Sequence, residues 1–216
     1  IKMAEISGDA LQLSSELIQD YNENKSSLVE SMEQRVDRYE DALDTYLLKV
    51  SGLDLSESDS RMVSILLHCI SDFERISDHA VNIRDSAVEM HEKKMNITSD
   101  GLEDLTVYSK AVQDIVQETI QAFRTGNLEL AREVEPFEEV IDGLAIEMRQ
   151  RHITRLRKGR CRLEAGLLLD DMINSYERIS DHCSNIAVYM LQINEDGFDT
   201  HGYLEFVAQE DSGWFR

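Results

Sequence analysis

A six-residue sequence occurs twice in this chain and constrains its fold more than any other feature. Glu-Arg-Ile-Ser-Asp-His fills positions 74–79 and recurs unchanged at 177–182, and Asn-Ile follows each copy at the same spacing. Two copies in equivalent surroundings indicate that the second half of the chain repeats the first. We therefore expect two halves with the same structure.

Apolar residues recur at intervals of three and four along six stretches, which is the spacing of amphipathic helices. The chain has one Pro, and its ten Gly lie mostly between these stretches, as expected of long helices rather than sheets. Short connections place successive helices antiparallel. We therefore predict an all-α fold of two tandem three-helix bundles, over residues 1–95 and 96–193, followed by a C-terminal tail over 194–216.

Turn-forming residues separate the six predicted helices at 22–25, 51–60, 96–101, 125–127 and 158–160. The fifth helix is expected to run through Met148, with a bend at Pro136, and the sixth from Leu163 to about Ile193.

Acidic residues dominate the charge of the chain. Lys and Arg number 22 against 43 Asp and Glu, which gives a net charge of -21. Such a surface repels nucleic acid, anionic lipid and free phosphate, and it favours cations as ligands. Cys69, Cys161 and Cys183 form no Cys-x-x-Cys pair, which fits a reducing cytoplasm. No apolar run approaches the roughly 20 residues that a membrane helix needs, so we predict no inserted segment.

Each copy of the repeat places two carboxylates four residues apart on a predicted helix, where like charges repel by roughly 0.2 to 0.5 kcal/mol per pair. The helix before each copy also carries an acid, three residues and then Asp, although Glu40 or Asp44 could take the place of Asp41. Four carboxylates from two antiparallel helices would form an oxygen-rich site for Mg, Ca, Mn or Fe ions. The candidate metal ligands are Asp37, Asp41, Glu74, Asp78, Glu138, Asp142, Glu177 and Asp181.

The alternative is that these acids are solvated faces of a very acidic helical protein. Repetition of the same residues in two diverged halves favours a site. His79 and His182 point about 100° away from the carboxylates, so positions on the surface or between helices suit them better than metal ligation. Basic residues are concentrated between Arg149 and Arg162, where they complement the dipole at the end of the fifth helix or contact an acidic partner or a membrane surface.

The duplicated motif, following a helix with Asp/Glu-x-x-x-Asp, resembles the PhoU family of phosphate-regulation proteins. The resemblance covers residues 1 to about 193 and implies a six-helix fold whose acid pairs hold multinuclear clusters of iron or another metal. It matches that family's acid pairs at all eight candidate ligands. The segment 152–161 and a start without Met resemble the cytoplasmic C-terminal domain of bacterial sodium/phosphate cotransporters, which would be tethered to the inner membrane.

The resemblance implies a regulator of phosphate uptake whose partner is a membrane transporter, in the same polypeptide or not. Self-association as a homo-oligomer is a further prediction. A free-standing PhoU regulator and a metal-free helical interaction module are the alternatives. An enzyme is not expected, because di-iron bundles use Glu-x-x-His and none of the six histidines has Glu three residues before it. The negative charge makes direct phosphate binding depend on a bridging cation.

Overall fold

Six helices make up the part of the chain that the structure, a computed structural model, describes, residues 1–194. They are α1 (Lys2–Gln19), α2 (Glu23–Ser51), α3 (Glu57–Glu92), α4 (Ser99–Thr125), α5 (Leu128–Arg157) and α6 (Leu163–Asn194). Residues 1–194 contain no strand. The predicted all-α fold is therefore confirmed. The predicted tail lies outside the described residues, except for Asn194 at the end of α6.

Side-chain caps fix where four of the helices begin. Asn22, Ser56, Thr98 and Asn127 each accept a hydrogen bond from a backbone N–H in the first turn that follows. These bonds satisfy amide groups that have no partner inside a helix. After α4 the backbone reverses at Gly126, whose φ of 65° lies in the left-handed region that glycine adopts most easily. The breaks between helices thus follow from local sequence.

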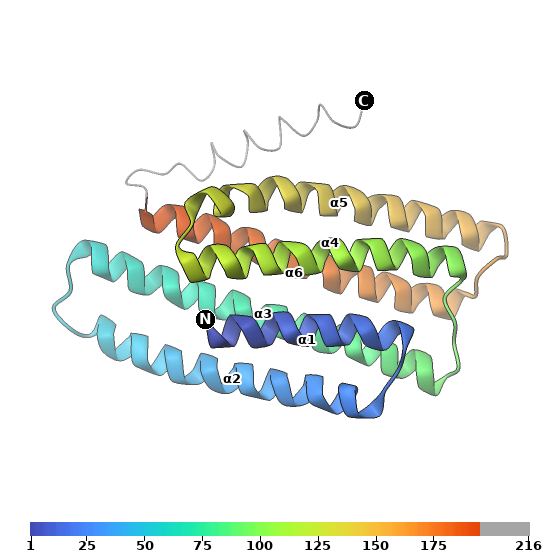
Figure 1. Ribbon diagram of the computed structural model, residues 1–216, viewed down its shortest axis with the longest axis horizontal. Coiled ribbons are helices and arrows are strands. Elements are labelled where there is room, and N and C mark those ends of the chain that lie inside the picture. Colours follow the sequence, from blue (N-terminus) through green and yellow to red (C-terminus); the bar gives the residue numbers. More distant parts are fainter. Residues whose placement is uncertain (195–216) are drawn as a thin grey trace.

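The two sets of three helices lie side by side (Figure 1), with α1 to α3 in one and α4 to α6 in the other. The long helices α3 and α6 pack against each other at the centre, and α1 also contacts α4. Phe73 and Phe123 meet edge to face across the boundary, with ring centroids 5.2 Å apart. The predicted division at residue 95 falls in the connection between α3 and α4.

A single hydrophobic core runs through both halves. The repeated sequence contributes to it directly, since Ile76, Ser77, Ile179 and Ser180 are all 0% exposed. The apolar part of the repeat is therefore explained by packing. Its acidic residues, arginine and histidine need another explanation.

The fifth helix is longer than the apolar pattern predicts, since α5 continues nine residues past Met148 to Arg157. Arg149, Arg151 and Arg155 stabilise this extension through ion pairs with acids of α4, α5 and α6. A pattern of apolar residues does not register such a segment, because its contacts are polar. Pro136 lies inside α5 without ending it.

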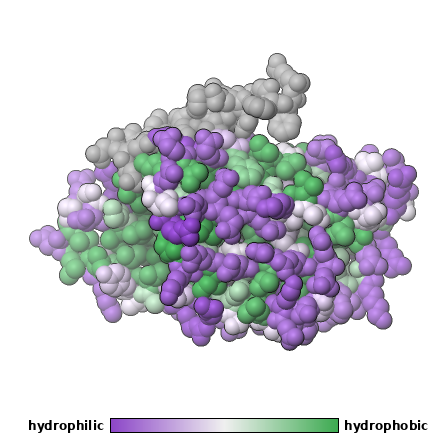
Figure 2. All heavy atoms as spheres, viewed as in Figure 1, coloured by the Kyte–Doolittle hydropathy of each residue, from purple (hydrophilic) through white to green (hydrophobic). Residues whose placement is uncertain are grey.

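Hydrophilic side chains cover much of the face seen in Figure 2, and hydrophobic ones gather toward the end where α2 joins α3. The exposed apolar residues near that connection are Tyr46, Leu48, Leu53 and Met62. Within residues 1–194, none of the helices has the length and apolar character required to span a bilayer.

Candidate metal centres

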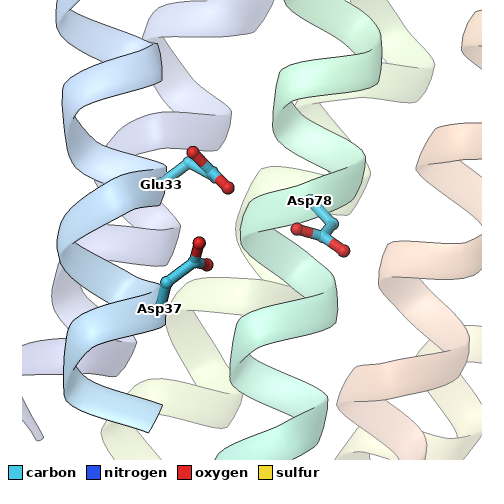
Figure 3. Close-up of side chains that lie close together, drawn as sticks. All are labelled: Glu33, Asp37 and Asp78. Carbon is cyan, nitrogen blue, oxygen red and sulfur yellow. The ribbon is translucent and has the colours of Figure 1, made fainter. Parts of the chain in front are cut away.

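The first acidic cluster lies between α2 and α3. Glu33 and Asp37 project from α2 toward α3, which carries Asp78 (Figure 3). One carboxylate oxygen from each of the three lies within 4.8 Å of the others. All three side chains are half-buried, so the cluster is open to solvent on one side. We call these three residues the first centre.

Glu40 and Glu74 border the first centre from α2 and α3. Burial, followed by the nearby charges of Asp78 and Glu40, raises the pKa of Glu74 to about 7. Burial, with Asp44 next, also raises the pKa of Glu40. Burial and the charge of Asp37 raise the pKa of Glu33. Because each carboxylate makes its neighbours harder to ionise, a cation here would relieve the repulsion among them.

The second centre lies at the matching place between α5 and α6. It consists of two triads that share Glu138. Glu135 and Glu139 complete one triad, and Asp142 and Asp181 complete the other. Within each triad one carboxylate oxygen from every residue lies within 4.8 Å of the others. Glu135 and Glu138 are each only 8% exposed, so this centre is deeper than the first.

The burial of the second centre raises the pKa values of three of its carboxylates. Burial is the main cause that raises the pKa of Glu138 to about 8, with the charge of Asp142 next. Burial and then Glu177 raise the pKa of Asp142 to about 6. Burial also raises the pKa of Glu135, although a hydrogen bond donated by the Ser184 hydroxyl opposes the shift. A cluster of like charges in a low-dielectric setting is costly unless it is protonated or neutralised.

The donor set fits a hard cation. Every ligand atom in both centres is a carboxylate oxygen, a donor that Mg²⁺, Ca²⁺ and Mn²⁺ prefer and that iron also accepts. Oδ1 of Asp142 is buried and has no hydrogen-bond partner among the described residues. Buried polar atoms are normally paired, so an unpaired one in a centre suits a ligand that supplies positive charge.

The structure distributes the eight predicted ligands unequally. Asp37 and Asp78 meet in the first centre, and Glu138, Asp142 and Asp181 meet in the second. Asp41 is exposed on α2 and belongs to neither centre. Glu74 borders the first centre, beside Asp78.

Glu177 borders the second centre but pairs with an arginine. Nη2 of Arg149 lies 2.6 Å from its Oε2 and also 2.6 Å from Oδ1 of Asn174, while Nε lies 3.3 Å from Oδ1 of Asp170. The three α6 residues are spaced four and three apart, so they share one face toward α5. Arg149 thus neutralises one carboxylate that the sequence assigned to a metal.

The structure adds Glu33, Glu135 and Glu139 to the clusters. Glu33, Asp37 and Glu40 are spaced four and three apart on α2, and Glu135, Glu139 and Asp142 repeat that spacing on α5. Residues so spaced share a helix face. This spacing aligns Glu40 with Asp142, whereas the predicted ligands align Asp41 with Asp142, one residue away. The shared spacing is the sequence signal that identifies the added residues.

The two repeated histidines lie between the halves, at one of the two kinds of position expected for them, between helices rather than on the surface. His79 of α3 and His182 of α6 stack with ring centroids 5.6 Å apart. Nδ1 of His182 lies 2.7 Å from Oδ1 of Asp72, whose side chain also accepts a hydrogen bond from Asn185. The histidines therefore join α3 to α6, which explains why both copies of the repeat retain them.

A family model described as the PhoU domain matches residues 1–87 and 105–190. The chain belongs to the PhoU family. The matched ranges include every residue of both centres. The PhoU resemblance drawn from the repeat is confirmed.

Several relatives carry the name of phosphate-specific transport system accessory protein PhoU homolog. The Thermotoga maritima homolog 1 is 26% identical over 71% of this chain, and the match spans 65% of that protein's length. The Deinococcus radiodurans homolog is 24% identical over 74% of each protein. The Aquifex aeolicus homolog is 22% identical over 95% of this chain and 92% of its own.

Two solved structures share the fold. The crystal structure of PhoU from Pseudomonas aeruginosa superposes with a TM-score of 0.82 at 21% identity, covering 89% of this chain and 91% of that one. The phosphate transport system regulatory protein PhoU from Streptococcus pneumoniae gives a TM-score of 0.76 at 18% identity, with coverage of 91% and 94%. Both solved PhoU chains therefore have the arrangement described for this PhoU family member.

Proposed function

We propose that this PhoU domain is a regulatory accessory component of a phosphate transport system. The observation that carries the proposal is the match of the PhoU model to both halves of the chain, including the residues of both acidic centres. The relatives named above are accessory proteins of phosphate-specific transport systems, and one solved neighbour is titled a regulatory protein. Regulation rather than catalysis is the role that these names support.

The relatives favour the accessory-protein interpretation over the cytoplasmic domain of a sodium/phosphate cotransporter. The proposed partner is a membrane component of the transport system, which the domain would contact from the cytoplasm. Self-association into a homo-oligomer remains a prediction. A protein with 43 acidic and 22 basic residues is a poor partner for nucleic acid.

The proposed cofactors are cations held by the two centres. In the first centre, Glu33, Asp37 and Asp78 would supply the oxygens, and in the second Glu138 would serve both triads and so bridge two ions. Iron, Mn²⁺, Mg²⁺ and Ca²⁺ all accept such donors. A bound cation would offset the mutual repulsion that raises the pKa of Glu74 and Glu138.

A melting experiment tests metal binding. Chelator-treated protein is titrated with Mn²⁺, and the expected result is a rise in melting temperature, because a ligand that binds the folded state stabilises it. Asp78→Asn combined with Asp181→Asn should abolish that rise. Asp9→Asn combined with Asp41→Asn changes two exposed acids and should preserve it. A metal-free interaction module would show no rise in any of the three proteins.

Phosphate uptake in cells tests the regulatory role separately. Deleting the gene for this chain in its host should increase phosphate uptake under phosphate-rich conditions, and the wild-type chain should restore control. Unchanged uptake and unchanged expression of phosphate transporters after deletion would refute the role, whatever the metal content of the protein.

A further inference from the structure

A cavity of about 470 Å³ lies at the end of the molecule where α3 leads into α4 and α5 leads into α6. Its wall comes from two connections far apart in sequence, residues 94–98 and 159–162, together with Ala165 of α6. Three of its lining side chains are basic: Lys94, Arg160 and Arg162. The lining residues include no Asp or Glu, although acids outnumber bases 43 to 22 in the chain.

The structure divides the basic run of the sequence into two parts. Arg149, Arg151 and Arg155 lie along α5 and form ion pairs with acidic residues. Arg160 and Arg162 follow α5, and within residues 1–194 their side chains form neither an ion pair nor a hydrogen bond. Among the described residues, no acidic side chain therefore neutralises the charge of the two arginines that line the cavity.

Complementing the dipole at the end of α5 does not account for this arrangement. That role suits Arg155 and Arg157, which lie in the last turn of α5. Lys94 comes instead from the connection after α3, with φ of 50°, a left-handed conformation that is uncommon for residues other than glycine. Two separate segments thus bring cations to one cavity.

Two helices also begin at the cavity. Thr98, the N-cap of α4, and Ala165, in the first turn of α6, both line it. Helix N-termini carry partial positive charge and unpaired N–H groups, which adds to the field of the three cations. Asp100 and Glu164 lie in those same first turns but not among the lining residues.

We propose that this cavity, lined by Lys94, Arg160 and Arg162, binds phosphate or the phosphate group of a larger molecule. Arginine and lysine donate charge-assisted hydrogen bonds to phosphate oxygens. The volume falls within the roughly 300 to 1,000 Å³ of small-molecule sites, and Met95 and Ile97 give part of the wall an apolar character. The site needs no bridging metal ion, so it is independent of the proposed metal centres.

Calorimetric titration of chelator-treated protein with inorganic phosphate and with pyrophosphate tests the proposal. Both anions should bind, and Arg160→Ala combined with Arg162→Ala should weaken binding at least roughly tenfold, as expected for lost charge-assisted hydrogen bonds. Lys94→Ala should weaken it as well. Arg157→Ala combined with Lys158→Ala is the matched control, since both residues are exposed in the same segment but do not line the cavity. This control should bind nearly as wild type.

The other outcomes overturn the proposal. Absence of binding at millimolar phosphate and pyrophosphate would exclude the site. Equal weakening in the two arginine-containing double variants would indicate a diffuse basic surface. Binding to vesicles of anionic lipid without binding to either free anion would assign this end to a membrane surface. Binding that requires added Mn²⁺ and is lost in Asp78→Asn with Asp181→Asn would place phosphate at the metal centres.

Discussion

Arg149 reaches from α5 to α6, where its Nη2 lies 2.6 Å from Oε2 of Glu177. The first half has no equivalent contact, because the position on α2 that corresponds to Arg149 is the buried Leu47. Within residues 1–194, the one ion-pair partner of Glu74, the counterpart of Glu177, is its neighbour Arg75 at 3.7 Å. Burial therefore raises the pKa of Glu74 to about 7. The two repeats hold the same glutamate in different electrostatic settings.

Replacing Arg149 with Ala should destabilise the protein more than replacing a surface arginine. Arg149 bonds to three residues of α6 and its side chain is 29% exposed, so we expect a loss of about 1–2 kcal/mol in the free energy of unfolding. Arg151→Ala removes ion pairs of a 55% exposed side chain and should cost clearly less than Arg149→Ala, because solvent screens exposed pairs. Urea unfolding measures both, and equal losses would contradict the role given to Arg149.

Glu33→Gln and Asp41→Asn should differ in their effect on metal binding. Glu33 belongs to the first centre and Asp41 does not. Removing even an outer partner of a metal ligand weakens affinity about 10–100-fold, so losing a ligand should cost at least as much at this centre. Asp41→Asn should bind as wild type. Elemental analysis after dialysis against limiting Mn²⁺ compares the two, and a lower metal content in Asp41→Asn alone would reverse the assignment.

The metal-free protein should lose stability as pH rises from about 5 to 8. The pKa is raised to about 6 for Asp142, about 7 for Glu74 and about 8 for Glu138, with burial as the first cause in each. In this window the folded chain holds protons that the unfolded chain has released, so raising the pH favours unfolding.

Urea midpoints across that pH range measure the slope. Glu138→Gln should flatten it, most clearly between about pH 6 and 8, because glutamine cannot ionise. Glu103→Gln, which changes an exposed glutamate of α4, should leave the slope as in wild type. A wild-type stability that is constant or rises over the range would contradict the prediction.

Two buried tyrosines offer a matched test of the packing between the halves. The Tyr176 hydroxyl lies 2.8 Å from Oγ of Ser15, whereas the Tyr108 hydroxyl has no hydrogen-bond partner among residues 1–194. Tyr176→Phe should cost about 1 kcal/mol, and Tyr108→Phe should be neutral or slightly stabilising, since it removes an unpaired polar group. Thermal unfolding separates the two, and a larger loss from Tyr108→Phe would show that its hydroxyl has a partner.

Most helix boundaries follow from local sequence. Asn22, Ser56, Thr98 and Asn127 cap the helices that follow them through side chains two or three residues from the amides they bind. Apolar spacing then sets which helix face is buried. The duplication and the six-helix fold were predictable for this reason. The end of α5 was not, because Arg149, Arg151 and Arg155 extend it through partners on α4 and α6.

The sequence by itself determined that Glu74 and Asp78 of the first half recur as Glu177 and Asp181 in the second, since the repeat displays them directly. Only the tertiary structure decided which of them meet. Glu33 and Asp41 each lie four residues from Asp37, about 40° to either side of it on α2, and the packing of α3 leaves Asp41 exposed while Glu33 joins the first centre. The cavity at Arg160 likewise exists only because folding brings two distant connections together. The interaction energy of a charge depends on the distances to its neighbours, which sequence order does not specify.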